Sequence, residues 1–278
     1  AADEKTAKDL YEDYRFYDKR VYYYPAKDLL FFQADIHGNL LIRQRMQVIR
    51  ALLERQEEIT VVTSIDGCMD YLLPLEKIEK QLIHFRNDSS LDMDKLTAAL
   101  VHMGYERVGQ VEMPGQFSIR GGIIDIYSLT EENPWRIELW GDEIDSIRSF
   151  DAQSQRSLEN LDEIAIYPAV EWNDGKKMVS FVDYFPREKT LLFLDEPTLG
   201  LDVLARAELW DVIRALKGRI TVILTTHYME EAEALSDRVG VMKDGRLLAL
   251  GTPEELKART GCEKFEDAFI AIVKGAGK

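Results

Sequence analysis

The sequence predicts an α/β protein with a parallel sheet, flanking helices and one small, inserted antiparallel β-domain. Apolar or β-branched runs at 21–24, 59–63 and 191–194 are separated by helical patterns, which is typical of an α/β layer. Between residues 105 and 167 the chain changes to short strand-like runs punctuated by glycine and proline turn signals. The 278 residues are enough for two or three domains of this kind.

We expect the first α/β layer to occupy residues 1–88. Its elements, in order, are a helix within 1–19, a strand at 21–24 that Pro25 stops, a helix at 40–56, a strand at 59–63, a helix near 66–73 and a strand at 82–85.

The antiparallel β-domain is expected at 89–168, followed by a return segment at 169–189. Asp92 can cap a helix that runs to Met103, and Gly104 can end it. The expected strands are 105–113, 117–120, 123–127, 135–140, 144–150 and 164–167.

Residues 190–278 return to an α/β pattern. We expect strands at 191–194 and 220–226, helices at 203–217, 229–235 and 263–273, and a hairpin of 239–242 with 247–250. The hairpin turn is Asp244-Gly245, a dipeptide that favours the type I′ turn. A further helix begins after Thr252 with proline first and two acids next, which suits the positive end of a helix.

Composition excludes several classes of protein. The net charge of −15 lies mostly before residue 190 and would repel a phosphate backbone, so we expect no direct DNA binding. Two cysteines give no disulfide framework, no apolar run reaches transmembrane length and no signal peptide is visible, so a cytoplasmic location is expected. The four histidines have no metal-ligand spacing, and a start at Ala1 is typical of a fragment or a processed end.

Asp195 and Glu196 stand at the carboxyl end of an apolar strand, where ligands bind in open α/β sheets. One carboxylate there can hold Mg²⁺ through water, and the next can orient an attacking water. However, the chain has no Gly-x-x-x-x-Gly-Lys-Ser/Thr loop to cradle phosphates, and no Leu-Ser-Gly-Gly-Gln segment precedes the strand.

The order of motifs in 190–278 resembles the C-terminal half of an ABC-type ATPase domain from an ABC-2-type exporter. The motifs are Leu194-Asp195-Glu196-Pro197-Thr198, Gly200-Leu201-Asp202, Thr226-His227, Asp237-Arg238 and Lys243-Asp244-Gly245-Arg246. The resemblance implies that Asp195 acts on Mg²⁺, Glu196 polarises water, Asp202 faces a partner domain and His227 contacts the γ-phosphate. The alternative is that each side chain now only caps a strand or faces solvent, because nothing else would hold the phosphate. We therefore expect no cofactor in isolation, no autonomous ATPase, and Mg-ATP binding only if a phosphate loop is supplied.

Residues 20–190 resemble a different family, the transcription-repair coupling factors, in their N-terminal UvrB-like module. The matching segments are 23–28, Gln33-Ala34-Asp35-Ile36-His37-Gly38-Asn39, 115–126, 136–139, 142–148 and 167–169. The resemblance implies that 1–88 is a partial helicase-like α/β domain of the P-loop NTPase type without ATP hydrolysis. It also implies that the β-domain docks onto UvrA through Arg120, Arg136 and Trp140.

Strand alternation agrees in part with that docking hypothesis. Residues 135, 137 and 139 fall on one face, whereas Arg136, Glu138 and Trp140 fall on the other. If the first face is core, an arginine and a tryptophan project together, and both types are enriched in interface hot spots. The alternative is that Trp140 packs under a helix and that Arg136 pairs near Glu138.

The two resemblances meet inside 191–197, a segment that either family could supply. We expect the strands of 191–194 and 220–226 to pair with those of 21–24 and 59–63 in one parallel sheet; without that pairing, an apolar edge would be exposed. Three hypotheses remain for the function. The first is a UvrA-docking interaction module that does not hydrolyse ATP. The second is an ABC exporter subunit completed in trans by another ATPase half beside a membrane permease. The third is a chimera, natural, engineered or an assembly artefact, without function as a unit.

Overall fold

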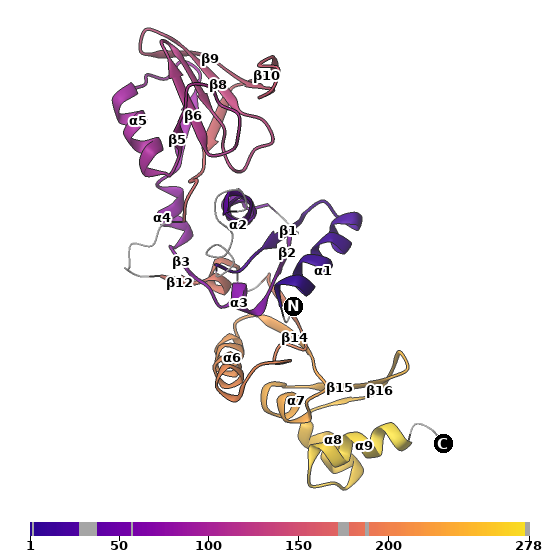
Figure 1. Ribbon diagram of the computed structural model, residues 1–278. Helices are drawn as coiled ribbons and strands as arrows, with labels where there is room; N and C mark the ends of the chain where they lie inside the picture. Colours follow the sequence, from indigo (N-terminus) through magenta and orange to yellow (C-terminus); the bar gives the residue numbers. More distant parts are fainter. Residues whose placement is uncertain (2, 28–37, 57, 172–177, 187–188, 276–278) are drawn as a thin grey trace. The chain divides into compact units, whose positions relative to one another are not determined.

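The computed structural model describes residues 1, 3–27, 38–56, 58–171, 178–186 and 189–275. Residues 28 and 33–37 of the family motifs therefore lie outside the described residues. The chain divides into two compact units, which are Asp3–Tyr184 and Phe185–Lys278, the latter grouped with the first two residues. Each unit is described by itself, and Figure 1 identifies their elements. No helix in the described ranges has the length and apolar character needed to cross a membrane.

The first unit begins with a small α/β layer. Its elements are α1 Glu4–Tyr17, β1 Val21–Tyr24, α2 Gly38–Leu53, β2 Thr60–Thr63, α3 Ile65–Cys68, β3 Tyr71–Leu72 and α4 Leu75–Glu79, with β12 Val179–Ser180 and the 3-10 helix η2 Phe181–Tyr184 returning to it. Strands β1 and β2 pair in parallel, with Tyr24 opposite Thr63. Strand β3 instead pairs with β12 across more than a hundred residues of chain.

The fully buried guanidinium of Arg45, in α2, ties this layer together. It pairs with Asp70 at 2.7 Å and with Glu171, donates to the carbonyl oxygen of Pro25, and lies 4.1 Å from the ring centroid of Tyr24. Glu171 comes directly after the β-domain, so this buried ion cluster holds the exit of that domain against α2. The expected helix at 66–73 is wrong in its second half, because β3 begins at Tyr71.

The β-domain contains a six-stranded sheet in the order β10-β9-β8-β7-β6-β5, antiparallel except where β5 pairs with β6. Its strands are β5 Glu106–Arg107, β6 Gln116–Arg120, β7 Ile123–Ile126, β8 Trp135–Trp140, β9 Glu143–Phe150 and β10 Ser157–Leu161, and a separate pair is formed by β4 Ile83–Arg86 and β11 Glu163–Ile166. The expected strand at 105–113 is reduced to β5, and β10 was not expected.

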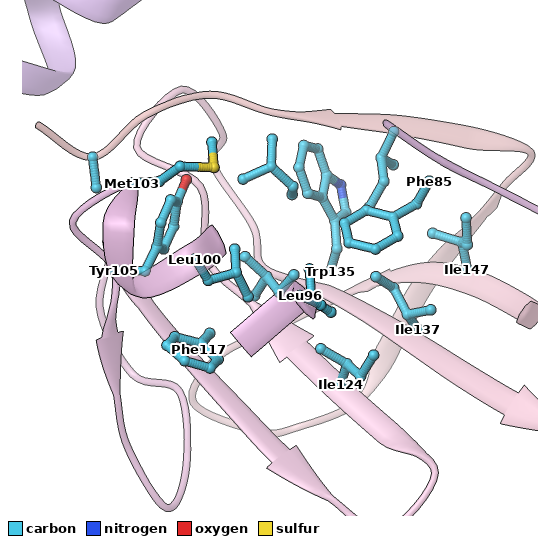
Figure 2. Packing of buried hydrophobic residues seen from close by; sticks show 14 of the residues in the cluster. Phe85, Leu96, Leu100, Met103, Tyr105, Phe117, Ile124, Trp135, Ile137 and Ile147 are labelled. Carbon is cyan, nitrogen blue, oxygen red and sulfur yellow. The ribbon is translucent and has the colours of Figure 1, made fainter. Parts of the chain in front are cut away.

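Helix α5, Met93–His102, covers this sheet and begins and ends as the sequence predicts. The carboxylate of Asp92 accepts the backbone N–H of Lys95 at 3.1 Å, and Gly104 follows with φ +86°. Figure 2 shows Leu96 and Leu100 of α5 above residues of the sheet, with Phe85 of β4 beside Trp135. These residues belong to one continuous hydrophobic core that lies within the β-domain.

The second unit contains two small sheets. Its elements are β13 Leu191–Asp195, α6 Val203–Leu216, β14 Thr221–Thr225, α7 Met229–Leu235, β15 Val239–Lys243, β16 Arg246–Gly251, α8 Pro253–Thr260 and α9 Phe265–Gly275. The β15–β16 turn has φ +50° at Asp244 and +73° at Gly245, as a type I′ turn requires. Thr252 and Glu255 form a capping box at the start of α8.

The expected continuous parallel sheet is wrong. Strand β13 pairs in parallel with β14, and β1 pairs in parallel with β2, in two separate sheets of two strands each. The apolar side chains of Leu191, Phe193 and Ile223 are exposed on one face of the β13–β14 pair.

Candidate functional site

The first candidate site is the polar face of the β-domain sheet at β8. Burial along β8 alternates as expected, because Trp135 and Ile137 are buried whereas Trp140 is 84% exposed. The β8–β9 register shifts between Glu138 and Leu139, directly before the hairpin. Sheet alternation therefore places arginine and tryptophan on the face opposite the core.

A buried carboxylate, Asp125 of β7, organises this face. Its oxygens accept two N–H groups from Arg136 at 2.7 and 2.9 Å and one from Arg120 at 2.6 Å. The Asp125 side chain is only 1% exposed. Asp125 was not among the expected site residues, although an aspartate inside an isoleucine-rich strand is a signal for a buried ion pair.

The two arginines have different surroundings. Arg136 also donates to Gln155 at 2.9 Å, lies 4.3 Å from the ring centroid of Phe150 and is 13% exposed. Hydrogen bonding to Asp125 raises the pKa of the Arg136 guanidinium. Arg120 makes a single ion pair with Asp125 and is 44% exposed. Arg120 is therefore available to a partner, whereas Arg136 is engaged in holding the sheet face.

Trp140 lies close to the turn that joins β6 and β7. Leu139 donates its backbone N–H to the carbonyl oxygen of Gly122 at 2.8 Å, so this turn contacts the end of β8. Arg120 is the last residue of β6 before the same turn. The hypothesis that Trp140 packs under a helix is wrong, and Arg136 pairs with Asp125 rather than near Glu138, whose partner is Arg148.

The second candidate site is the carboxyl end of the β13–β14 pair. Asp195 accepts a hydrogen bond from the hydroxyl of Thr225, its neighbour on β14. Glu196 follows with φ +42°, a left-handed conformation that is uncommon outside glycine. Its Oε1 lies 3.0 Å from Nδ1 of His227, so the fold brings together three of the residues that the ABC resemblance singled out.

Asp202 has a structural role in this unit. Its Oδ1 accepts the backbone N–H groups of Leu204 and Ala205, both at 2.9 Å, and so caps α6. The Asp202 carboxylate therefore caps α6, and no hydrogen bond between described residues joins it to Asp195.

A cavity of about 250 Å³ lies next to His227. It is lined mainly by polar and aromatic side chains of α6 and α7, among them Arg206, Trp210 and Glu231. The buried carboxylate of Glu231 accepts the indole N–H of Trp210 at 3.2 Å.

The residues at the end of β13 do not by themselves fit a Mg-ATP site. Across the described ranges, no group of three or more histidine, cysteine, aspartate or glutamate side chains is arranged to hold a metal ion. The sequence also provides no glycine-rich lysine loop for the phosphates. Asp195 and Glu196 therefore offer carboxylates without the groups that would position a nucleotide.

Comparison with known families divides the chain in the same place. The UvrB interaction domain family matches residues 83–172, which include all of the sheet that carries Arg120, Arg136 and Trp140. A second family, described as "AAA domain, putative AbiEii toxin, Type IV TA system", matches 184–231, which include Asp195, Glu196 and His227. Residues 83–172 are thus similar to the UvrB interaction domain, and residues 184–231 are similar to a fragment of an AAA domain.

Curated relatives are transcription-repair-coupling factors. The protein of Bacillus subtilis (strain 168) is 44% identical over 156 residues, covering 55% of this chain and 13% of the relative. Those of Staphylococcus aureus (strain MRSA252) and Staphylococcus haemolyticus are 35% and 37% identical over 162 and 152 residues. The S. aureus match covers 58% of this chain and 14% of the relative, and the S. haemolyticus match covers 55% of this chain and 13% of the relative. A large part of this chain, including the UvrB-interaction region, is therefore homologous to a small part of transcription-repair-coupling factors.

Proposed function

We propose that the β-domain docks a UvrA-like DNA-repair protein through the end of β8, and that the chain does not hydrolyse ATP. The observation that carries this proposal is Trp140, which is 84% exposed at the end of β8 in the six-stranded sheet. Tryptophan and arginine are the residue types most enriched in interface hot spots, and Arg120 lies at the neighbouring turn with its side chain half exposed.

The rigidity of the surface supports the proposal. Ion pairs with Asp125 hold the side chains of Arg120 and Arg136 in place. Little side-chain entropy is therefore lost when a partner binds Arg120. Trp140 lies on the face of β8 opposite the buried Trp135 and Ile137, so its exposure removes no residue from the core. A small set of anchors on a fixed frame is the arrangement that tight docking uses.

Calorimetric titration of the full chain with purified UvrA tests this proposal. Trp140→Ala and Arg120→Ala should each weaken binding by about 1–3 kcal/mol. Leu158→Ala, another exposed apolar residue of the same sheet, is the matched control and should bind normally. Normal affinity of a Trp140/Arg120 double variant would remove the docking proposal.

Arg136→Ala should also weaken binding, but by destabilising the sheet rather than by removing a contact with the partner. Its removal leaves the buried carboxylate of Asp125 with only the Arg120 ion pair. A chemical-denaturation curve measured on the same sample separates this loss of stability from a loss of contact.

A second candidate function is an ATPase half that another chain completes. The observation that favours it is the Glu196–His227 contact at the carboxyl end of β13. We expect no steady-state ATP turnover from the chain alone, because nothing in the sequence cradles the phosphates. Turnover that Glu196→Gln abolishes would make the enzyme the better hypothesis.

A further inference from the structure

Glu4, in the first turn of α1, is held by three hydrogen-bond donors from other parts of the first unit. Its Oε1 accepts the backbone N–H of Ala26 at 2.8 Å and the hydroxyl of Ser64. Its Oε2 accepts the hydroxyl of Tyr23. No basic side chain in the described part of the chain pairs with Glu4, so neutral donors alone satisfy this carboxylate.

The donors lie at a ligand-binding position of the fold. Tyr23 is in β1, Ala26 follows β1 by two residues, and Ser64 follows β2 directly. The two strands are parallel and in register, so their carboxyl ends lie together. Open α/β sheets bind ligands in the crevice beyond those ends, and phosphate groups are held there by N–H and hydroxyl donors.

The donors are fixed before any ligand arrives. Ser64 is fully buried, and its oxygen accepts the backbone N–H of Gly67 at 3.1 Å, which directs its own proton toward Glu4. A side chain at Gly67 would meet Thr63 Oγ1 at 2.3 Å, so the strand ends pack tightly against this residue. Burial, followed by the hydrogen bond to Glu4, raises the pKa of Tyr23, which keeps its hydroxyl protonated as a donor.

We propose that Tyr23, Ala26 and Ser64 form an oxyanion-binding site, which Glu4 fills from within the chain. The ligand is a small oxyanion, either a phosphate group or a carboxylate, and it binds when α1 moves away from the strand ends. Helix α1 contacts β1 and β2, whereas the aromatic side chains of Phe16 and Tyr17 in its last turn are exposed. The site thus couples anion binding to the position of α1.

Thermal unfolding of the full-length Glu4→Ala variant tests the proposal, with inorganic phosphate titrated against chloride at constant ionic strength. Phosphate should raise the Tm of this variant saturably by a few degrees and that of the wild type by much less, because a ligand that binds the folded state stabilises it and in the wild type the ligand must first displace Glu4. Ser64→Ala in the Glu4→Ala background should abolish the response. The control is Glu12→Ala, which removes an exposed acid from the same helix and should behave as wild type.

Acetate and ATP in parallel titrations identify the source of the oxyanion. A larger shift with ATP than with phosphate indicates a nucleotide, and a shift with acetate indicates a carboxylate. If the Glu4→Ala variant is too unstable to measure, Glu4→Ser replaces it, since the short side chain removes the carboxylate from the three donors and leaves the site open. Equal responses of the Glu4 and Glu12 variants to every anion would overturn the proposal.

Discussion

The β-domain and the β13–β14 pair use similar apolar residues with opposite results. In the β-domain, six strands, α5 and the β4–β11 pair enclose a continuous core in which Phe117, Ile124 and Ile137 are fully buried. In the second unit, two parallel strands leave Phe193 58% exposed. Parallel sheets are normally covered on both faces. An apolar strand therefore forms a core only where its neighbouring strands and covering helices are present.

The largest expected consequence is a difference in resistance to proteolysis. Trypsin should cut near Lys189, between the two units, and a fragment close to Asp3–Tyr184 should persist while the rest is digested. The reason is that regions with few buried apolar contacts open locally at low free-energy cost. A time course analysed by mass spectrometry measures this.

Chymotrypsin provides the control, because its different specificity should give the same boundary. Loss of both units at one rate would show that they unfold together, and the contrast between the two regions would then be wrong.

A pair of alanine substitutions compares the two regions directly. Ile137→Ala should lower the free energy of unfolding by about 2–5 kcal/mol, because it leaves a cavity in a closed core. Phe193→Ala should change it by no more than about 0.5 kcal/mol, because the ring is already largely in water. Urea unfolding followed by tryptophan fluorescence measures both, in backgrounds that keep Trp135 alone to report on the β-domain or Trp210 alone to report on the second unit. Equal losses in the two variants would contradict this comparison.

Local signals predicted most of the elements. Helix α5 has an aspartate cap and a glycine stop, and the β15–β16 hairpin has Asp244-Gly245, so neither depends on distant residues for its position. Strand β10 was missed because its residues are almost all exposed and show no apolar alternation. Strand β3 was missed because it pairs with β12 more than a hundred residues later, which no local pattern records.

The candidate sites were predictable in residue type but less so in role. Trp140 is exposed as alternation indicated, and Glu196 and His227, which the motif order singled out, lie 3.0 Å apart, although the roles expected of them remain predictions. The sequence could not show that Asp125 binds both arginines, because that pairing depends on the register of three strands. Nor could it show that the expected parallel sheet stops at two strands, since pairing partners are a property of the tertiary structure.

A smaller effect is expected from the buried ion pair of the β-domain. Asp125→Ala should destabilise that domain by about 1.5–3 kcal/mol, because it leaves the largely buried Arg136 without the carboxylate that accepts its hydrogen bonds. Asp211→Ala in α6 should cost about 0.5 kcal/mol or less, since the Asp211–Arg214 pair is solvent-exposed. Urea titrations of the two variants measure the difference. A loss for Asp125→Ala as small as that for Asp211→Ala would mean that solvent reaches the Asp125 network.

The smallest expected effect concerns helix caps, for which the two regions should behave alike. Asp202→Ala should lower the stability of the second unit by about 1 kcal/mol, because the N–H groups of Leu204 and Ala205 lose their acceptor. Asp202→Asn should restore most of that loss, since an asparagine oxygen caps a helix as well as an aspartate oxygen does. Thermal unfolding followed by fluorescence, in a background that keeps Trp210 as its single tryptophan, measures both variants.

The Asp202→Ala and Asp202→Asn variants also distinguish the two roles proposed for this residue, a helix cap and a contact with a partner domain. If Asp202 serves only as a cap, Asn recovers stability and nothing else changes, as it would at Asp92, the equivalent cap of α5. If Asp202 faces an ATPase partner, as the ABC resemblance implies, its negative charge is needed there and Asn cannot replace it. Mixing the chain with an ABC ATPase half and measuring ATP turnover provides that readout. Turnover that Asp202→Asn abolishes, in a variant of normal stability, would show that the second unit still acts as half of an enzyme.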